Sequence, residues 1–339
     1  MALKEFQKRI AYQIYPASFC DSNNDGWGDL NGITSKLQYL HDLGIGMIWL
    51  SPIYPSPMDD MGYDIADYKS INPLFGTMAD FDKMMAKANE LDIKIVMDFV
   101  INHTSTSHTW FQEAIKDPKS KYRDYYIIRS GKGKRKPNNW DSCFTGTCWN
   151  HMPGSIGEYY MHLFCDTQAD LNYKNHLVVE EIKDIIRFWL DKGVYGFRCD
   201  VINCIYKTTL KNDNPFKLFD KGSKYYFNQD GFFKIMGEIR RDVLDSYDTF
   251  LLGETSHIDA KMGKKFIDDR VLDTFFEFDH MFSRMHKALP VFKKKFSPKY
   301  MMEKIKYWQD SIPWMANYLE NHDQLRSISS YGDPNYFFE

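Results

Sequence analysis

The stretch GFRCDVINCI, residues 196–205, places two charged side chains inside a segment that otherwise has the composition of a short buried strand. Arg198 and Asp200 lie two residues apart, so on a strand both side chains point to the same face. Burying a charge is costly unless it is paired or used. The pair therefore indicates either a buried ion pair or a reactive centre.

Polar side chains also follow other apolar segments: Asp98, Asn102 and His103; Glu254; and His322 and Asp323. If these segments are parallel strands of one barrel, their carboxyl ends meet, and Asp200, Glu254 and Asp323 share a pocket. Carboxylates held close move each other's pKa values apart, so an anion and a neutral acid coexist. Glycoside hydrolysis needs such a pair, because one carboxylate attacks while another donates a proton.

Metal-dependent hydrolysis is the competing use for histidines beside carboxylates. The segments INHTS and ENHDQ contain neither an HxH nor an HExxH pattern. Arg198 would also repel a cation bound near Asp200. The residues therefore favour carboxylate chemistry over a catalytic metal.

Seven segments have the composition of strands: 10–15, 47–51, 93–100, 194–200, 249–253, 271–278 and 314–319. Helical patterns lie between most of them. Residues 29–44 place Ile33, Leu37, Leu40 and Leu43 on one face, and residues 174–193 place Val178, Ile182, Ile185, Ile186 and Trp189 on another. This alternation predicts a parallel sheet covered by helices, either an open doubly wound sheet or a closed barrel.

The polar groups at successive strand ends favour an α/β fold of the (β/α)₈ barrel type. No GxGxxG or GxxxxGK[ST] motif supports a nucleotide site. We expect three segments: 1–103 with strands one to three, 104–170 as an inserted lobe rich in Gly, Pro, Asn and aromatics, and 171–339 with strands four to seven. An eighth βα unit and a C-terminal β-domain are missing from this span. The isolated span is therefore expected to be unstable or inactive.

The stretch DSNNDGWGD, residues 21–29, has the spacing of a calcium loop. The expected oxygen donors are the side chains of Asp21, Asn23, Asp25 and Asp29 and the carbonyl of Trp27. The glutamate usual at position twelve is replaced by a glycine. A polar turn that caps the next helix is the alternative, but we favour one structural Ca²⁺ and expect no organic cofactor.

Composition limits the partners. The net charge is −3, so nucleic acid is not an expected partner, and the basic run KGKRK (132–136) is interpreted as a solvated loop. No apolar run approaches the roughly 18 residues of a membrane span. The N-terminal residues lack the apolar region of a signal peptide, and the six cysteines are scattered. We expect a cytoplasmic monomer with reduced thiols.

Several segments resemble one known family. DFVINH (98–103), GFRCDVIN (196–203), GET (253–255) and ENHD (320–323) resemble, in this order, the four signature segments of the α-amylase superfamily, glycoside hydrolase family 13. QADLN (168–172), the opening segment 12–33 and GYDIADY (62–68) resemble its oligo-1,6-glucosidase and α-glucosidase branch. The resemblance spans nearly the whole chain and implies an exo-acting, retaining α-glucosidase.

The resemblance implies a role for each carboxylate. Asp200 would be the nucleophile, and Glu254 the general acid that later activates water. Asp323 would hold the 2- and 3-hydroxyls of the glucose and favour its distorted form. Arg198 would keep Asp200 ionised and oriented.

The same resemblance implies the substrate-binding residues Tyr63, Asp64, His103, Phe164, Arg198, Val201 and His322. His103 and His322 would bind hydroxyls of the sugar ring, and Asp64 would bind the terminal glucose. The rings of Tyr63 and Phe164 would be stacking walls. Asp98 would support the site without reacting.

Val201, directly after the expected nucleophile, is similar to the residue of α-1,6-preferring members, and this favours isomalto-oligosaccharides. Maltase and trehalose-6-phosphate hydrolase activity remain alternatives, as does a catalytically silent binding scaffold.

Overall fold

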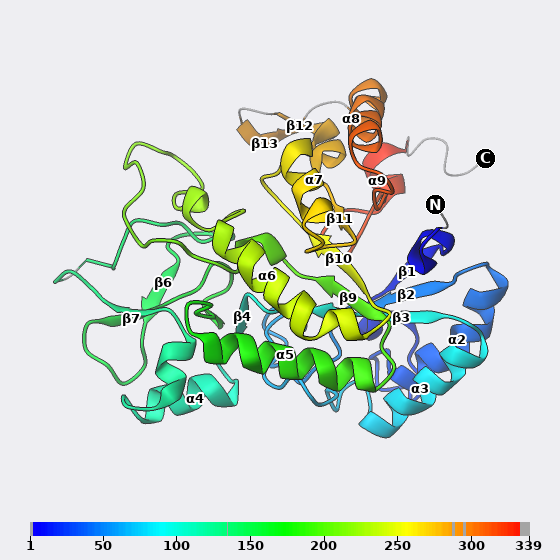
Figure 1. The fold of residues 1–339 in the computed structure, drawn as a ribbon, viewed down its shortest axis with the longest axis horizontal. Coiled ribbons are helices and arrows are strands. Elements are labelled where there is room, and N and C mark those ends of the chain that lie inside the picture. Colours follow the sequence, from blue (N-terminus) through cyan, green and yellow to red (C-terminus); the bar gives the residue numbers. More distant parts are fainter. Residues whose placement is uncertain (1–2, 134, 287–288, 294–295, 333–339) are drawn as a thin grey trace.

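The computed structural model describes residues 3–133, 135–286, 289–293 and 296–332. Its centre is one parallel sheet with the strand order β1-β2-β3-β9-β10-β11 (Figure 1). The strands are β1 (Ala11–Ile14), β2 (Met47–Leu50), β3 (Lys94–Phe99), β9 (Gly196–Cys199), β10 (Phe250–Glu254) and β11 (Thr274–Phe276). Spatial order follows chain order throughout, whereas a doubly wound sheet reverses at a switch point. The sheet is therefore the wall of an incomplete (β/α)₈ barrel, as predicted.

Residues along each strand alternate between two apolar clusters, as the two-residue period of a strand requires. Ile48, Ile95 and Leu251 face the large cluster beneath the helices. Val96 and Leu252 face a smaller cluster inside the barrel wall. The charged positions of β3 and β9 belong to this inner face.

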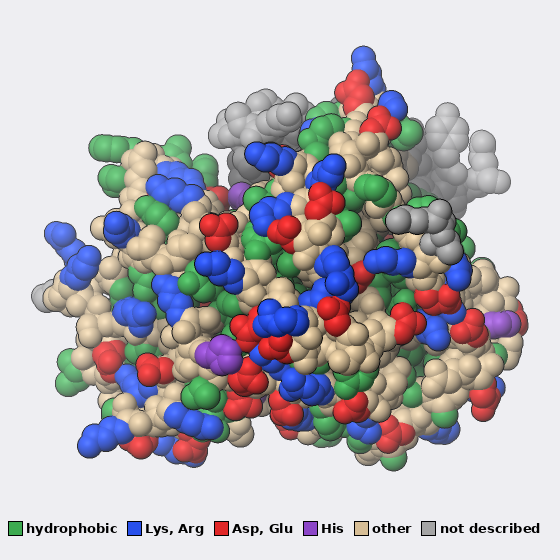
Figure 2. Space-filling model, in the orientation of Figure 1, with side chains coloured by type: hydrophobic (Ala, Val, Ile, Leu, Met, Phe, Trp, Pro, Cys, Tyr) green, Lys and Arg blue, Asp and Glu red, His purple; other side chains and the backbone are tan. Residues whose placement is uncertain are grey.

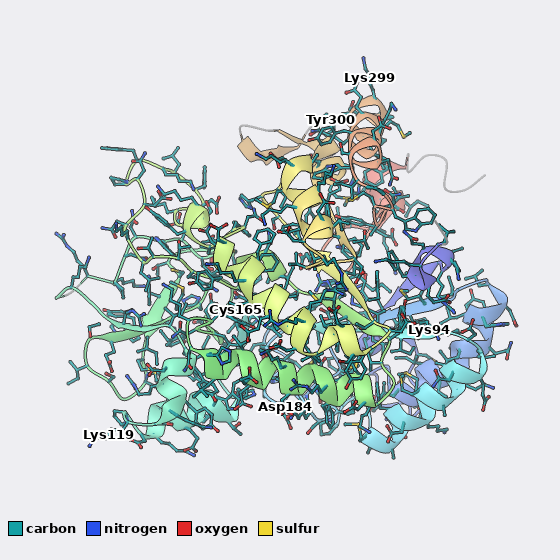
Figure 3. The ribbon with its side chains drawn as sticks, viewed as in Figure 1. Lys94, Lys119, Cys165, Asp184, Lys299 and Tyr300 are labelled. Atoms are coloured by element: carbon teal, nitrogen blue, oxygen red, sulfur yellow. The ribbon has the colours of Figure 1, made fainter. Side chains whose placement is uncertain are left out.

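The longer helices are α2 (Leu30–Asp42), α3 (Met78–Glu90), α5 (His176–Asp191), α6 (Asp230–Asp242), α7 (Ala260–Asp268) and α8 (Pro298–Ser311). Most of them begin at a residue whose side chain accepts a backbone N–H, such as Asp29 before α2 and Asn175 before α5. Apolar faces pack toward the sheet, and Asp184 on α5 lies on the solvent side (Figure 3). Within the described residues, no helix combines the length and apolarity needed to cross a membrane.

Residues 104–170 contain most of a separate lobe, at the left of Figure 1. It holds β4 (His103–Ser105), α4 (Thr109–Lys116), β5 (Ile128–Ser130), β6 (Trp149–His151), β7 (Glu158–Met161) and β8 (Gln168–Asp170). β4 pairs with β8, and β5, β7 and β6 form a three-stranded antiparallel sheet. The apolar cluster of the lobe contains Trp140 and Trp149. It also includes Cys204 and Tyr226 from the chain after β9.

Short elements complete the described chain. The helices are α1 (Pro16–Phe19) and α9 (Ser327–Tyr331), and the hairpin strands are β12 (Met285–His286) and β13 (Leu289–Lys293). The 3₁₀ turns are η1 (Glu5–Lys8), η2 (Lys121–Tyr125), η3 (Ile202–Cys204), η4 (Ser223–Tyr225), η5 (Leu244–Ser246) and η6 (Asp279–Arg284).

Two sequence predictions are wrong here. Residues 314–319 form no strand: the backbone turns at Trp314, whose φ is +62°, and none of these residues pairs in a ladder. The segment instead lies beside β11, where the Thr274 hydroxyl donates to the Trp314 carbonyl at 3.0 Å. Leu43 is exposed, since α2 ends at Asp42 and the chain turns away at Gly44, whose φ is +89°. Residues 333–339 and Lys134 of the predicted basic loop lie outside the described residues.

Charged side chains of both signs are mixed on the surface of the molecule. Figure 2 shows basic and acidic side chains interspersed over the viewed face. Some charged side chains of the described residues pair at i, i+3 or i, i+4 within one helix, as Lys306 does with Asp310. The viewed face shows no extended area of one sign.

Candidate active site

The register of three neighbouring strands brings four charged side chains together. Asp98 of β3 lies beside Arg198 of β9. Asp200 follows at the end of β9, and its backbone N–H donates to the Phe99 carbonyl. Glu254 ends β10 one position beyond the residues paired with β9. Parallel pairing therefore places the four charged side chains at the carboxyl edge of three adjacent strands.

Arg198 joins the carboxylates. Its Nη1 donates to Asp98 Oδ1 at 2.8 Å and to Asp200 Oδ1 at 2.5 Å, and its Nη2 donates to Glu254 Oε2 at 2.7 Å. Only 1% of the arginine side chain is exposed. A guanidinium suits this position, because its planar fork bonds several oxygens at once and stays charged. Arg198 thus lies behind the carboxylates and does not line the cavity.

Burial is the largest influence on the pKa of Asp200 and raises it, as do the neighbouring carboxylates Glu254 and Asp98, while Arg198 opposes the rise. Burial likewise raises the pKa of Asp98. Asp98 Oδ2 accepts hydrogen bonds from Trp49 Nε1 at 3.0 Å and from the Tyr63 hydroxyl at 2.8 Å. One cation facing three carboxylates favours retention of a proton within the cluster. Asp98 is fully enclosed and can only support its neighbours.

A cavity of about 1120 Å³, called here the first cavity, opens above this edge and is lined by Asp200, Glu254 and Asp323 together. The structure thus brings the three predicted carboxylates to one space, although Asp323 comes from a turn and not from a strand end. Burial followed by the charge of Glu254 raises the pKa of Asp323. Glu254 Oε2 also accepts the Val201 N–H at 3.1 Å, which fixes the carboxylate relative to the turn after β9.

Five of the seven predicted binding residues also line the first cavity: Tyr63, His103, Phe164, Val201 and His322. The rings of Tyr63 and His322 stack with their centroids 5.1 Å apart and 3° between their planes. The His103 Nε2 lies 3.1 Å from the Tyr63 carbonyl, and its Nδ1 lies 3.2 Å from Asn102 Nδ2. A hydrogen bond from His103 to a sugar hydroxyl would have to replace one of these contacts. Burial lowers the pKa of His103 to about 4, so the ring is neutral near pH 7.

Asp64 does not line the first cavity, contrary to its predicted role in binding the terminal glucose. It is fully buried, and it accepts hydrogen bonds from the Ser56 hydroxyl and from the backbone N–H groups of Asp59 and Asp60. Asp64 therefore shapes the turn and does not reach the cavity. Asp60 lines the cavity instead, and Gln168 Nε2 donates to its Oδ2 at 2.7 Å. Burial raises the pKa of Asp60.

Gln13 also lines the first cavity, and the sequence analysis did not identify it. Its Nε2 lies 2.9 Å from His322 Nδ1 and 3.1 Å from the Ser51 hydroxyl. Because the Gln13 amide donates to Nδ1, the hydrogen of a neutral His322 is on Nε2, the nitrogen 3.5 Å from Asp323 Oδ1. The segment YQIYP contains Gln13 but gives no signal of this contact.

A buried ion pair attaches the lobe to the barrel. Lys207 Nζ lies 2.7 Å from Asp170 Oδ2 at the end of β8, and both side chains are almost fully enclosed. Lys207 also donates to Asn102 Oδ1 at 2.7 Å, and Asn102 Nδ2 donates to Asp170 Oδ1 at 3.1 Å. The three residues lie on different segments, so the network fixes the lobe against the strand ends.

A second cavity, of about 590 Å³, adjoins the first and shares Glu254 with it. Glu254, Val201, Phe164 and Asp323 line both cavities, whereas Asp200 lines only the first. The other lining side chains include Asp220, Phe227 and His257. None of these three was identified from sequence, because they come from two loops with no recognisable motif.

The predicted calcium loop has two parts. Asp21 accepts backbone N–H groups of Asn24 at 2.7 Å and Gly26 at 2.9 Å, and these bonds lower its pKa. Asn23 Nδ2 donates to Asp25 Oδ2 at 3.0 Å. Asp29 points elsewhere and caps α2 through the Gly32 N–H, with further bonds from Ser22. Asp21, Asn23 and Asp25 carry hard oxygen donors of the kind that Ca²⁺ takes. Asp29 Oδ1 accepts the Gly32 N–H and its Oδ2 accepts the Ser22 N–H.

Comparison with known proteins gives consistent results. The family described as "Alpha amylase, catalytic domain" matches residues 13–338. An oligo-1,6-glucosidase of Parageobacillus thermoglucosidasius is 44% identical over 97% of this chain and 60% of its own length. One from Bacillus cereus is 41% identical over the same shares. The crystal structure of Bacillus licheniformis trehalose-6-phosphate hydrolase superposes with a TM-score of 0.93 at 38% identity, over 99% of this chain and 61% of that one. The chain therefore spans about three fifths of these relatives.

Proposed function

The chain belongs to the alpha-amylase catalytic-domain family, and on this premise we propose that it provides the catalytic centre of a retaining α-glucosidase. The enzyme would remove terminal α-1,6-linked glucose from isomalto-oligosaccharides. The observation that supports this most strongly is the single cavity lined by Asp200, Glu254 and Asp323, with Arg198 behind the first two.

The proposed reaction proceeds by two displacements. Asp200 attacks the anomeric carbon while the bond to the leaving oxygen breaks and Glu254 gives that oxygen its proton. A water then attacks the same carbon, Glu254 takes a proton from the water, and the bond to Asp200 breaks. Of the two reacting carboxylates, Arg198 bonds Oδ1 of Asp200 and Oε2 of Glu254, so the other oxygen of each would react.

Binding of the terminal glucose is assigned to groups around the first cavity. In the proposal, Asp323 and His322 hold ring hydroxyls, and Asp60 takes the position that the sequence had given to Asp64. Tyr63 and Phe164 provide apolar walls against the faces of the sugar.

The preference for α-1,6 linkages rests on Val201, which lies between the two cavities. Its backbone is left-handed, with φ +36° and ψ +38°, a conformation unusual for a β-branched residue. The turn therefore holds a rigid, branched side chain where the incoming linkage must pass. The similarity to oligo-1,6-glucosidases supports the same preference. The fit to a trehalose-6-phosphate hydrolase structure keeps that activity as the second candidate.

The test is glucose release from isomaltose, maltose and trehalose 6-phosphate by the full-length protein, with Asp200→Asn as the control. Preference for isomaltose, lost in the variant, is the expected result. Preference for another substrate would retain the mechanism and reject the linkage. Turnover of none of the three would favour a binding scaffold.

We also propose one structural Ca²⁺ in the loop 21–29, held by Asp21, Asn23, Asp25 and the Trp27 carbonyl, with Asp29 acting only as the cap of α2. A chelator should lower the melting temperature, and added Ca²⁺ should restore it in the wild type but not in Asp25→Ala. No effect of the chelator would reject the site.

A cytoplasmic location stays a prediction, which cell fractionation would check.

A further inference from the structure

The turn that carries Asp323 reaches the first cavity without belonging to a strand. Residues 314–323 pair in no ladder, whereas the other two carboxylates of this cavity end or follow strands of the central sheet. The position of the turn therefore depends on side-chain contacts. We propose that His280 is a positioning residue for this turn and acts on it through Tyr318. The inference rests on the proposed function, because it explains how Asp323 is held against the sugar.

Tyr318 is bound at both its backbone and its side chain by one short segment after β11. His280 Nε2 lies 2.9 Å from the Tyr318 carbonyl, and the Tyr318 hydroxyl donates to the Glu277 carbonyl at 2.9 Å. The rings of His280 and Tyr318 meet edge to face, with centroids 4.8 Å apart and 80° between the planes. The Phe276 ring makes a second edge contact with Tyr318, at 5.1 Å and 69°. These contacts hold Tyr318 in place five residues before Asp323.

Glu277 sets the orientation of the His280 ring. A carbonyl oxygen can only accept, so the bond to Tyr318 places a hydrogen on Nε2 of His280. The other ring nitrogen, Nδ1, contacts Glu277 Oε1, and one further proton, on the imidazole or on the carboxyl, completes this bond. Glu277 Oε2 accepts the Asp279 N–H at 2.6 Å. The side chains of His280 and Glu277 are only 3% and 6% exposed, so water does not compete for these bonds and the ring stays aimed at Tyr318.

The turn has a second anchor at His322. Gln13 Nε2 lies 2.9 Å from His322 Nδ1, and the Tyr63 ring stacks on the imidazole at 5.1 Å. Within the turn, Asn321 Oδ1 accepts the Asp323 N–H at 3.0 Å. The Asp323 carboxylate lies 3.5 Å from His322 Nε2. The last two contacts are internal to the turn, so the carboxylate follows the turn when the turn moves.

His280 lines neither the first nor the second cavity, so it acts on the reaction only through the turn. Without His280 the turn would keep its anchor at His322 but lose the bond to the Tyr318 backbone. Hydrogen bonds to the 2-hydroxyl of a glycoside strengthen as the sugar distorts toward the transition state. A displaced Asp323 would therefore weaken binding of the transition state more than binding of the substrate. Loss of His280 should thus lower kcat and leave KM nearly unchanged.

The experiment compares variants of the full-length protein on p-nitrophenyl α-glucoside and on its 2-deoxy analogue, which lacks a hydroxyl proposed to bind Asp323. His280→Leu removes both hydrogen bonds of the ring, whereas His280→Gln keeps an N–H donor for the Tyr318 carbonyl. Tyr318→Phe removes only one hydroxyl, so it keeps the fold even if His280→Leu does not. His108→Gln is the matched control. His108 is also a buried histidine, and its Nδ1 accepts the Trp110 N–H at 3.1 Å, but it lines neither cavity.

In His280→Leu, kcat for p-nitrophenyl α-glucoside should fall about tenfold to a hundredfold, the loss of one or two hydrogen bonds, while KM changes less than about threefold. In the same variant kcat for the 2-deoxy analogue should fall less than about threefold, because the interaction with the missing hydroxyl is already absent. His280→Gln should recover part of the loss, Tyr318→Phe should lower kcat about threefold to tenfold, and His108→Gln should match the wild type.

Two results would overturn the assignment of His280. One is an equal loss on both glucosides in a His280 or Tyr318 variant. The other is an unchanged kcat in Tyr318→Phe and in whichever His280 variant folds. A wild type inactive on p-nitrophenyl α-glucoside would instead reject the proposed function itself, and the inference with it.

Discussion

Replacing Lys207 with methionine tests how the lobe is attached to the barrel. Methionine keeps the length and the apolar stem of the lysine but removes its charge. Asp170 Oδ2 would then lose the cation 2.7 Å away, in a position where the carboxylate has no access to solvent. Asp170 Oδ1 would keep its bonds from Asn102 Nδ2 at 3.1 Å and the Leu163 N–H at 3.0 Å.

Removing one partner of a buried ion pair leaves an uncompensated charge and typically costs about 3–5 kcal/mol of the free energy of unfolding. The loss of the bond from Lys207 to Asn102, 2.7 Å long, places this variant toward the upper part of that range. An exposed ion pair of similar length is worth about 0–1 kcal/mol. Lys306 and Asp310 form such a pair on α8, 2.8 Å apart and mostly exposed.

Denaturant unfolding of the full-length protein, followed by circular dichroism, measures the difference between Lys207→Met and the matched control Lys306→Met. The double variant Lys207→Met/Asp170→Asn should be more stable than Lys207→Met alone, because the unpaired charge is gone. If Lys207→Met stays within about 1 kcal/mol of the control, the burial argument fails. Limited proteolysis should also cut the lobe faster in Lys207→Met, since the network holds it against the strand ends.

Two further predictions concern the charged centre and the start of α2. The proposed mechanism needs ionised Asp200, so activity should rise as pH passes upward through the pKa of this residue. Arg198 lowers that pKa, and Arg198→Met should therefore move the acid limb of kcat/KM to higher pH. Replacing the buried Arg240 by methionine should leave the limb in place. An unchanged limb in the Arg198 variant would contradict the proposed role of Asp200. Asp29→Ala removes the cap of α2 and should cost about 1 kcal/mol of the free energy of unfolding in chelator-treated protein. Under the same conditions Asp25→Ala should cost less than about 0.5 kcal/mol. Equal losses in the two variants would argue against the cap.

Much of the architecture follows from local sequence patterns. The two-residue period places Arg198 and Asp200 on one face, and the helical period correctly identifies α5 through Val178 and Trp189. These features depend on neighbours along the chain, which is why periodicity reveals them. The prediction of a seventh strand at residues 314–319 is wrong. The composition of this segment suits a strand, but its backbone turns at Trp314.

The orientation of individual polar side chains depends on distant partners. Asp60 and Asp64 lie in one turn, but the backbone N–H groups available inside that turn bind Asp64, so Asp60 faces the cavity. Similarly, His257 and Asp220 are separated by 37 residues and meet only where two loops converge.

Sequence by itself therefore determined the barrel type, the family and the three carboxylates expected to meet, because alternating elements and short motifs encode these locally. Tertiary structure decided which carboxylates line the cavities, which residue holds the lobe and which loops meet at the second cavity. The physical reason is that a buried polar group must be bonded. Its partner is whichever group the fold brings near, and chain distance does not predict that choice.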